Sequence, residues 1–248
     1  MTTQQMLSPF RRAITKYNMI KDGDKIAVGV SGGKDSVTLL KLLAEYKKFS
    51  PEKFELIAIT IDLKFNGVEM DVSPIKELCD QLGVEYFVET TDIGQIVFDE
   101  RKEKSPCSLC SKMRKGALYN LAIEKGCNKV ALGHHKDDLI DTLFLSLFYE
   151  GRLSTFAPKL LLDRTGLILI RPLVFTNEID ITPYARSLPV VKSNCPVNKL
   201  TKREKIKDIA KSIQQEIPNL REMVFTALVH PDRYNLFDKF ERDSEILD

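Results

Sequence analysis

Short runs rich in β-branched residues alternate with amphipathic stretches along most of the chain, and this alternation limits the folds open to it. Four runs have the length and composition of strands: KIAVGV (25–30), FELIAIT (54–60), EYFVET (85–90) and KVALGH (129–134). Strands separated by helices need crossover connections. We therefore expect an α/β fold with a largely parallel sheet covered by helices on both faces.

The rest of the chain adds a fifth apolar run and a mostly helical C-terminal part. GLILIRPL (166–173) predicts one more strand, which makes a parallel five-stranded sheet. We expect one domain over residues 1–176, with an N-terminal helix, and a helical region over 177–248; a single compact domain is the alternative. No apolar stretch approaches the roughly 20 residues of a membrane span, and no secretory signal is visible, so we expect a cytoplasmic protein without membrane contact.

A glycine-containing loop follows the first predicted strand directly. Ser31-Gly32-Gly33-Lys34-Asp35-Ser36 combines two glycines, two hydroxyls and a lysine ahead of a helix, an arrangement that suits a bound phosphate. The spacing matches neither a Walker A loop nor the dinucleotide pattern of three spaced glycines. The alternative is an ordinary strand-to-helix turn with a helix cap.

A second polar cluster, Gly133-His134-His135-Lys136-Asp137-Asp138, follows the fourth predicted strand. Open α/β sheets bind ligands at the carboxyl ends of their strands, so these side chains are candidates for phosphate or Mg²⁺, with Asp35 or Asp138 as the metal ligand. A helix cap is the alternative role for Asp137 and Asp138. Zinc is disfavoured because neighbouring histidines point in different directions and no third soft ligand adjoins them.

The five cysteines differ in their surroundings. Cys107 and Cys110 form a C-x-x-C motif, which can chelate a metal, form a redox disulfide or bind a cluster, and the motif alone does not discriminate. Cys195 is the third candidate. Cys79 lies on the apolar face of a predicted helix and Cys127 at a helix-to-strand turn, so we expect both to be structural.

The positive charge of the chain is concentrated in two segments that also contain the candidate cysteines. The formal net charge is only +2, but residues 101–115 hold +5 and residues 195–211 hold +4, which leaves −7 for the rest. A basic segment of this kind is either a binding surface for an anionic partner or a solvated helix face.

The loop SGGKDS resembles the pyrophosphate loop of the N-type ATP pyrophosphatases. Together with PCSLCSKMRKGALYN, LGHHKDDLIDT, IRPL and the later single cysteine, it resembles the tRNA 2-thiocytidine synthetase family over roughly residues 8 to 200. The resemblance implies a Rossmann-like adenine nucleotide alpha hydrolase (HUP) fold with a helical C-terminal extension. One departure is that Pro196-Val197-Asn198 stands where some relatives carry a further cysteine.

The resemblance also implies the site residues. ATP is expected on the two polar motifs, at Ser31, Gly32, Gly33, Lys34, Asp35, Ser36, Gly133, His135 and Asp138. Cys107, Cys110 and Cys195 are expected to ligate a 4Fe-4S cluster with one open iron, which can accept a sulfide or substrate. The expected catalytic residues are Lys34, Asp35 and these three cysteines; Lys34 would offset charge on the departing pyrophosphate.

The implied reaction replaces the C2 oxygen of a tRNA cytidine, at position 32, with sulfur. Oxide is a poor leaving group, so ATP first adenylates that oxygen, and the products are 2-thiocytidine, AMP and diphosphate. The sulfur would come ultimately from a cysteine desulfurase, and the enzyme is expected to be a homodimer. Six residues of the basic segments are expected to contact tRNA phosphates: Lys112, Arg114, Lys115, Lys202, Arg203 and Lys205.

Three alternatives stay open at this point. A tRNA lysidine synthetase also adenylates C2 of a cytidine but needs no cysteines, so the C-x-x-C motif disfavours it. A cluster-free thiolase would carry a persulfide on Cys107 or Cys110 with Cys195 as the resolving thiol. An ATP-binding sensor module would have no turnover.

Overall fold

A computed structural model describes residues 1–101, 106–191, 194–196 and 202–234. The chain divides into two compact units. The first consists of residues 1–138 and 156–201, and the second of residues 139–155 and 202–248. Residue 176, where the sequence suggested a domain boundary, falls inside the first unit, and that boundary stays a prediction.

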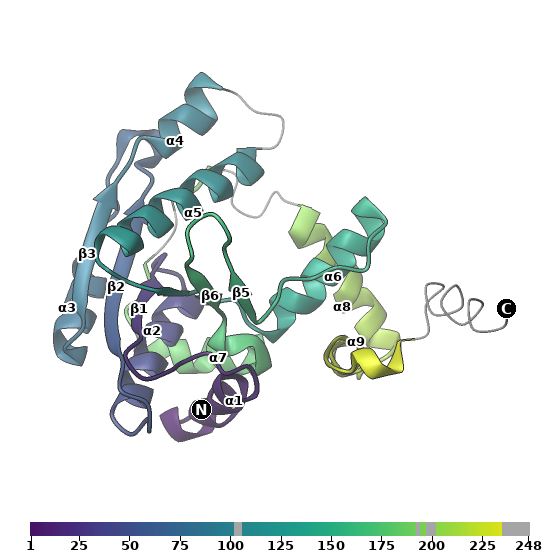
Figure 1. Ribbon diagram of the computed structural model, residues 1–248. Helices are drawn as coiled ribbons and strands as arrows, with labels where there is room; N and C mark the ends of the chain where they lie inside the picture. Colours follow the sequence, from purple (N-terminus) through teal and green to yellow (C-terminus); the bar gives the residue numbers. More distant parts are fainter. Residues whose placement is uncertain (102–105, 192–193, 197–201, 235–248) are drawn as a thin grey trace, which may run out of the picture. The chain divides into compact units, whose positions relative to one another are not determined.

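The first unit contains a six-stranded sheet in the order β3-β2-β1-β4-β6-β5 (Figure 1). The strands are β1 (Lys25–Gly29), β2 (Glu55–Asp62), β3 (Glu85–Thr90), β4 (Lys129–Ala131), β5 (Lys159–Leu161) and β6 (Ile168–Ile170). Strands β3, β2, β1, β4 and β6 pair in parallel with their neighbours, which confirms the predicted parallel strands. Strand β5 pairs antiparallel with β6 at the edge of the sheet.

Strand β5 corrects the predicted count of five. It has only three residues, and its apolar side chains Leu160 and Leu161 are 44% and 56% exposed rather than buried. An edge strand of this length has no buried face, so it leaves no period-two pattern in the sequence. Its pairing with β6 through a tight turn depends on tertiary structure.

The strand order changes direction beside β1. The chain leaves β1 for β2 and β3 on one side and then returns to place β4 on the other side. The carboxyl ends of β1 and β4 therefore flank a topological switch point, the place where open α/β sheets form their ligand crevice. The two polar motifs found in the sequence follow these two strands.

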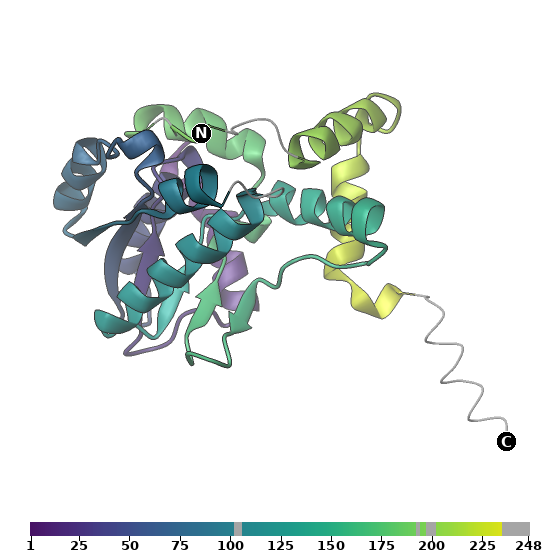
Figure 2. The same cartoon turned by 90° about the horizontal axis from the view of Figure 1, so that it is seen from above.

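Helices cover both faces of the sheet (Figures 1 and 2). On one face, Leu118 and Ala122 of α5 pack against Ile57, Ile59 and Val130. Ile26 and Val28 alternate to the other face, and α2 contacts β1 and β2. The helices are α1 (Thr3–Lys16), α2 (Lys34–Lys47), α3 (Ser73–Leu82), α4 (Ile93–Gln95), α5 (Pro106–Glu124), α6 (Lys136–Glu150), α7 (Glu178–Tyr184), α8 (Lys202–Glu216) and α9 (Leu220–Val229).

The second unit is helical and has a buried carboxylate at its centre. Asp141 of α6 is fully buried, and its Oδ1 lies 3.3 Å from Arg221 Nη1 of α9. Burial raises the pKa of Asp141, while the nearby Arg221, Lys207 and Arg203 oppose that rise. Arg203 of α8 also donates to Thr142 Oγ1 at 3.0 Å. These polar contacts join the three helices of the unit.

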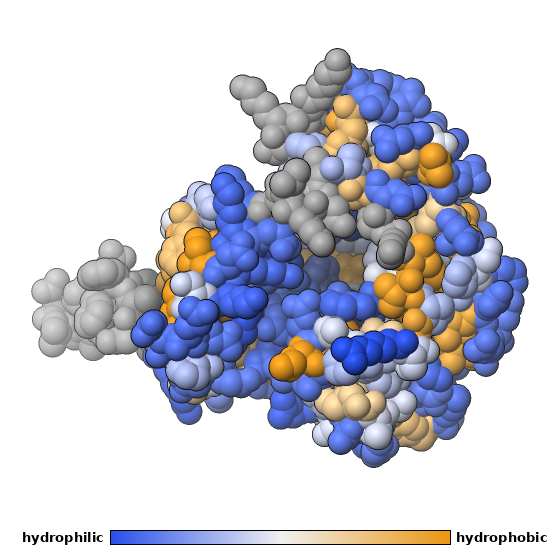
Figure 3. All heavy atoms as spheres, turned by 180° about the vertical axis from the view of Figure 1, so that it is seen from behind, coloured by the Kyte–Doolittle hydropathy of each residue, from blue (hydrophilic) through white to orange (hydrophobic). Residues whose placement is uncertain are grey.

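The described helices include none with the length and apolar composition needed to cross a bilayer. On the face drawn in Figure 3, hydrophilic side chains predominate and apolar ones form scattered groups.

Candidate functional site

The loop after β1 has a backbone that requires glycine at one position. Gly32 has a φ of +81°, and a Cβ there would lie 2.5 Å from Met70 Cε and 3.1 Å from Val191 Cβ. A side chain would therefore be strained and also clash. The carbonyl of Gly32 accepts a hydrogen bond from the amide of Val191 at 2.9 Å. Gly33 then caps the N-terminus of α2 in an extended conformation.

The two serines of the loop close it. Ser36 Oγ donates to the Gly33 carbonyl at 2.9 Å, accepts from the Ser31 amide at 3.1 Å and lies 3.2 Å from Ser31 Oγ. Ser36 is buried, whereas Ser31 is exposed. Ser36 therefore holds the loop in shape, and Ser31 is the serine positioned to meet a ligand.

Lys34, at the start of α2, is held by two carboxylates. Its Nζ lies 2.8 Å from Asp35 Oδ1 and 2.8 Å from Glu178 Oε1. Burial alone would lower the pKa of Lys34, but the hydrogen bonds to Asp35 and Glu178 outweigh burial and raise that pKa above its ordinary value. Lys34 is therefore a fixed positive charge at the mouth of the loop.

Glu178 was not among the residues predicted from the sequence. It is the first residue of α7, which follows β6 by way of a short 3₁₀ turn, Pro172–Phe175. The sequence offered one signal: an acidic residue shortly after the IRPL strand, at the same edge of the sheet as the loop. That signal cannot be told from an ordinary acidic residue in a first helical turn.

The second polar motif lies directly against the first. A Cβ on Gly133 would lie 3.0 Å from both the Asp35 carbonyl carbon and the Ser36 amide nitrogen. Glycine at position 133 therefore lets the end of β4 approach the start of α2 closely. The structure brings the two predicted motifs together.

His135 is buried among three carboxylates. Its Nε2 lies 3.7 Å from Asp35 Oδ1 and 3.5 Å from Asp138 Oδ2, and its Nδ1 lies 3.8 Å from Asp137 Oδ2. The side chain is 3% exposed, and its Nδ1 has no hydrogen-bond partner among the residues that the structure describes. Asp35 and Asp138 thus both lie near the same imidazole nitrogen, Nε2.

Asp137 and Asp138 also cap helices, the alternative role that the sequence suggested. Asp138 Oδ2 accepts from the His135 amide at 3.1 Å, at the N-terminus of α6. Asp137 Oδ2 accepts from the Glu178 amide at 2.7 Å, at the N-terminus of α7. The bond from Asp137 places Glu178 beside Lys34.

The two neighbouring histidines diverge, as expected. The His134 ring lies 4.8 Å from that of Phe156, whereas His135 faces Asp35 and Asp138. Arg171, from the IRPL segment, is buried, and its guanidinium lies 4.8 Å from the centre of the same Phe156 ring. Its Nη1 donates a hydrogen bond to the Ala157 carbonyl at 2.6 Å. Phe156 therefore contacts both His134 of the second motif and Arg171.

The C-x-x-C cysteines lie in the first turns of α5. Cys107 is exposed, and Cys110 is half-buried against Leu63, Ile93 and Val97, which cluster just beyond the end of β2. Burial raises the pKa of the Cys110 thiol; Arg114 opposes that rise, and the neighbouring Cys195 and Cys107 add to it. Cys107 and Cys110 therefore lie together at the start of α5, and the charge of Cys195 acts on Cys110; that the three cysteines share a cluster stays a prediction.

The chemistry of these thiols fits an iron–sulfur cluster. Thiolates are soft ligands, and Arg114 supplies a positive charge that opposes the rise in the pKa of Cys110. Within the described residues, none of the five cysteines is in a disulfide, and no three His, Cys, Asp or Glu side chains are arranged as a metal site. The remaining two, Cys79 and Cys127, are buried as expected, and burial raises their pKa values to about 12 and about 11.

The predicted RNA contacts fall in both units. Lys112, Arg114 and Lys115 are exposed on α5 in the first unit. In the second unit Lys202 and Lys205 are exposed, with Lys202 Nζ 4.7 Å from the Tyr149 ring. Arg203 is half-buried and bonded to Thr142, so part of its role is to join helices.

The sequence is similar to a known protein family and to named relatives. A family model described as a PP-loop domain matches residues 5–214. The tRNA-cytidine(32) 2-sulfurtransferase of Pelobacter propionicus is 42% identical over 247 residues, covering 93% of this chain and 91% of that protein. The protein of the same name from Aliivibrio fischeri is 41% identical over 246 residues, covering 95% of this chain and 80% of that protein.

Solved structures show the same fold. The U34-tRNA thiolase NcsA from Methanococcus maripaludis, determined with its 4Fe-4S cluster, superposes with a TM-score of 0.72 at 24% identity. The match covers 94% of this chain and 81% of that one. At this identity the likeness is one of fold, and it confirms the predicted class.

Proposed function

The chain belongs to the tRNA-cytidine(32) 2-sulfurtransferase family of PP-loop proteins, and from this membership we propose that it uses ATP to thiolate C2 of cytidine 32 in tRNA. The observation that carries the proposal is the contact between the two polar motifs at the ends of β1 and β4, with Lys34 fixed beside them. The presence of Cys107, Cys110 and Cys195 supports thiolation rather than lysidine synthesis, which needs no thiol.

The phosphate loop would act in the adenylation step. The Gly32 and Gly33 amides, Ser31 and the N-terminus of α2 are arranged to hold the β- and γ-phosphates of ATP. Attack of the cytidine O2 on the α-phosphorus breaks the bond to the β-phosphate oxygen, and the charge that develops on diphosphate faces the Lys34 ammonium. Asp35 or Asp138 would hold Mg²⁺, which would offset the charge of the ATP phosphates when bound.

Adenylation makes the C2 oxygen a leaving group. In the second step a sulfur nucleophile adds to C2, the bond from C2 to oxygen breaks, and AMP departs with the oxygen. Because the product carries a thiocarbonyl, a sulfur that attacks as hydrosulfide must also lose its proton. The adenylated base must therefore lie within reach of the cysteines as well as the loop.

Cys107, Cys110 and Cys195 would hold the 4Fe-4S cluster. When bound, such a cluster with three protein ligands offers an iron that can coordinate sulfide. Arg114 would favour the thiolate form of Cys110. The apolar side chains of Leu63, Ile93 and Val97 would limit the access of water to one side of Cys110. The exposed Cys107 also suits a persulfide mechanism without a cluster, which is the second candidate.

The partners that we propose are tRNA and a cysteine desulfurase. The exposed cations of α5 and α8 would contact tRNA phosphates, and a cysteine desulfurase would supply the sulfur. We place the enzyme in the cytoplasm and expect a homodimer.

Nucleoside mass spectrometry of tRNA from a deletion strain tests the function. We expect 2-thiocytidine to disappear and to return on complementation with the wild-type gene, but not with a Lys34→Ala variant. Loss of another thionucleoside would redirect the substrate, loss of lysidine would favour the synthetase, and an unchanged profile would favour the sensor module. Iron and sulfide analysis of anaerobically purified protein separates the two thiolation mechanisms: full activity in iron-free protein would support the persulfide.

A further inference from the structure

The N-terminal helix carries a third basic segment, outside the two described above. Residues 1–21 contain Arg11, Arg12, Lys16 and Lys21 and no Asp or Glu. In α1 the apolar side chains Met6, Phe10 and Ile14 are buried, so the helix turns Arg11, Arg12 and Lys16 to solvent. We call these three residues the α1 basic face.

The α1 basic face lines a hollow of about 510 Å³. Beside the three cations, the hollow is lined by the neutral polar side chains Gln4, Ser8 and Thr15. Its remaining lining residue, Leu7, is 4% exposed. The lining residues of the hollow therefore supply positive charge and hydrogen-bond donors and include no carboxylate, which suits phosphate groups.

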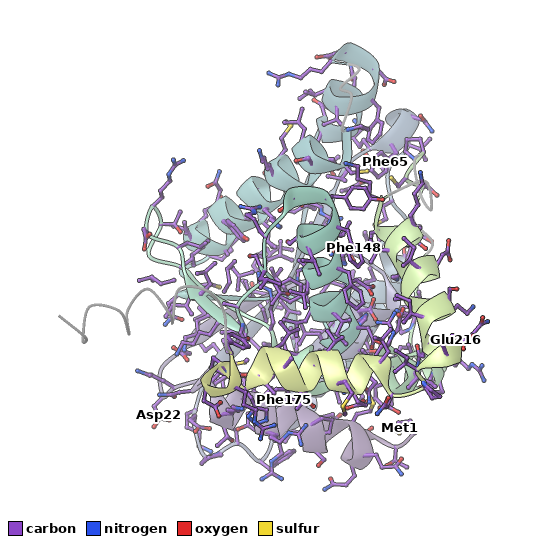
Figure 4. All side chains as sticks on the ribbon, turned by 90° about the vertical axis from the view of Figure 1, so that its right-hand side faces the viewer. Met1, Asp22, Phe65, Phe148, Phe175 and Glu216 are labelled. Atoms are coloured by element: carbon purple, nitrogen blue, oxygen red, sulfur yellow. The ribbon has the colours of Figure 1, made fainter. Side chains whose placement is uncertain are left out.

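Aromatic rings hold part of this face in place. The Arg12 guanidinium lies 4.8 Å and the Lys16 Nζ 5.7 Å from the centre of the Phe175 ring, and the Tyr17 ring lies 5.7 Å from the same ring. Figure 4 shows Phe175 beside α1. Cations stacked on a buried ring lose less freedom on binding than free side chains.

The α1 basic face lies close to the candidate site within the same unit. Phe175, beneath Arg12 and Lys16, is followed by Thr176, whose carbonyl accepts the amide of Lys136 at 3.0 Å. Lys136 belongs to the second polar motif. The ring that holds Arg12 and Lys16 is thus next in the chain to a residue that bonds the backbone of that motif.

Further positive charge adjoins the C-terminal end of α1. Lys159 of β5 donates to the carbonyl of Asn18, just beyond the helix. Burial lowers the pKa of Lys159, and the nearby positive charges of Lys129 and Lys21 lower it further. Lys129 is buried and ion-paired with Asp24, but a polyanion that contacts Lys159 and Lys21 together would relieve their mutual repulsion.

We propose that the α1 basic face binds the phosphodiester backbone of the tRNA substrate. The inference rests on the proposed function for the identity of the RNA, and the charge, the polar lining and the position of the face support it. Free nucleotide is not the occupant, since the loop at Lys34 serves that purpose. Contacts to the backbone would position the tRNA without reading its sequence.

The test is a titration of fluorescently labelled tRNA at several salt concentrations with the full-length protein. We expect the variant Arg11→Gln/Arg12→Gln/Lys16→Gln to bind at least about tenfold more weakly than wild type at low salt. The slope of log affinity against log salt should fall in magnitude by about 2–3, because each of the three lost phosphate contacts removes roughly 0.7–0.9 of a unit. A matched control, Lys47→Gln/Lys53→Gln/Lys76→Gln, removes three exposed charges outside the hollow and should bind within about twofold of wild type.

A second variant guards against a folding defect. Arg11→Lys/Arg12→Lys keeps both charges, so it should retain the wild-type salt slope even if the ring contacts weaken. Equal affinity and slope in the triple variant and its control would overturn the proposal. So would a change in molecular mass of the triple variant by light scattering, since the face would then join two copies of the chain.

The binding assay needs no turnover. A wild-type protein that binds tRNA through α1 but yields no 2-thiocytidine would contradict the proposed function and leave this inference standing. Thiolation that persists unchanged in the triple variant at limiting tRNA would contradict this inference and leave the proposed function standing.

Discussion

Lys34 Nζ and Glu178 Oε1 lie 2.8 Å apart, although 144 positions separate the two residues in the sequence. The ion pair links the start of α2 to the start of α7, and Asp137 fixes its acidic partner by accepting the Glu178 amide. The lysine of the phosphate loop is therefore oriented by a part of the chain that no local motif includes.

Replacing Glu178 with Gln should slow adenylation. The change removes one of the two carboxylates that hold the Lys34 ammonium. At a partly exposed site this pair contributes about 1 kcal/mol, which corresponds to a roughly fivefold lower kcat for tRNA-dependent diphosphate release. Asp180→Asn, on the same helix but not bonded to Lys34, is the control. Wild-type kcat in Glu178→Gln would show that Asp35 alone positions the lysine.

Lys34→Ala and Cys195→Ala should fail at different steps. Removing a charge that faces the departing diphosphate should lower adenylation by roughly 10²–10³-fold while the iron content stays at the wild-type level. Cys195→Ala should lose iron and thiolation but continue to release diphosphate. The measurements are diphosphate release and iron analysis on the same preparations. Equal loss of both activities in either variant would contradict separate sites.

Alkylation should distinguish the cysteines of the metal-free protein. The thiolate is the reactive form, so a raised pKa means slower reaction at a given pH. At pH 8 we expect the exposed Cys107 to react with iodoacetamide first and Cys110, whose pKa burial raises, to follow more slowly and to accelerate above pH 9. Cys79 and Cys127, with pKa values of about 12 and about 11, should stay unmodified until the protein unfolds. Peptide mass spectrometry gives the order; early labelling of Cys79 would be inconsistent with its burial.

Gly133→Ala should loosen the contact between the two polar motifs. The added methyl group would lie 3.0 Å from backbone atoms of Asp35 and Ser36, which cannot rotate away. We expect a loss of about 1–3 kcal/mol in unfolding free energy and weaker ATP binding. The control is Gly116→Ala in α5, where a Cβ meets nothing within 4 Å and should stabilise the helix by about 0.5–1 kcal/mol. Denaturant unfolding and ATP titration measure both effects, and equal stabilities for the two variants would refute the close contact.

Local patterns explain what the sequence predicted well. The parallel strands and the loop at Ser31–Ser36 depend on runs of neighbouring residues, and β1 and β4 were recognisable because their side chains are buried. The gathering of the two motifs followed from the general rule for open α/β sheets.

Long-range contacts account for what the sequence did not show. Glu178 reaches Lys34 only because α7 starts beside α2, and β5 exists only through its pairing with β6. The α1 basic face was missed for a different reason. The charge was counted only in the two segments that contain cysteines, so the basic residues of the N-terminal segment were not considered. Their direction also depends on tertiary structure, because the burial of Phe10 and Ile14 turns the cations of α1 to solvent.

The hydrogen bond from Val191 to Gly32 has a mechanical consequence. Four residues further on lies Cys195, and a chain of four residues spans at most about 14 Å. Any movement of Gly32 that keeps this bond carries Val191 with it. A ligand that moves the loop would therefore also limit where Cys195 can lie, since at most about 14 Å of chain separates Cys195 from Val191.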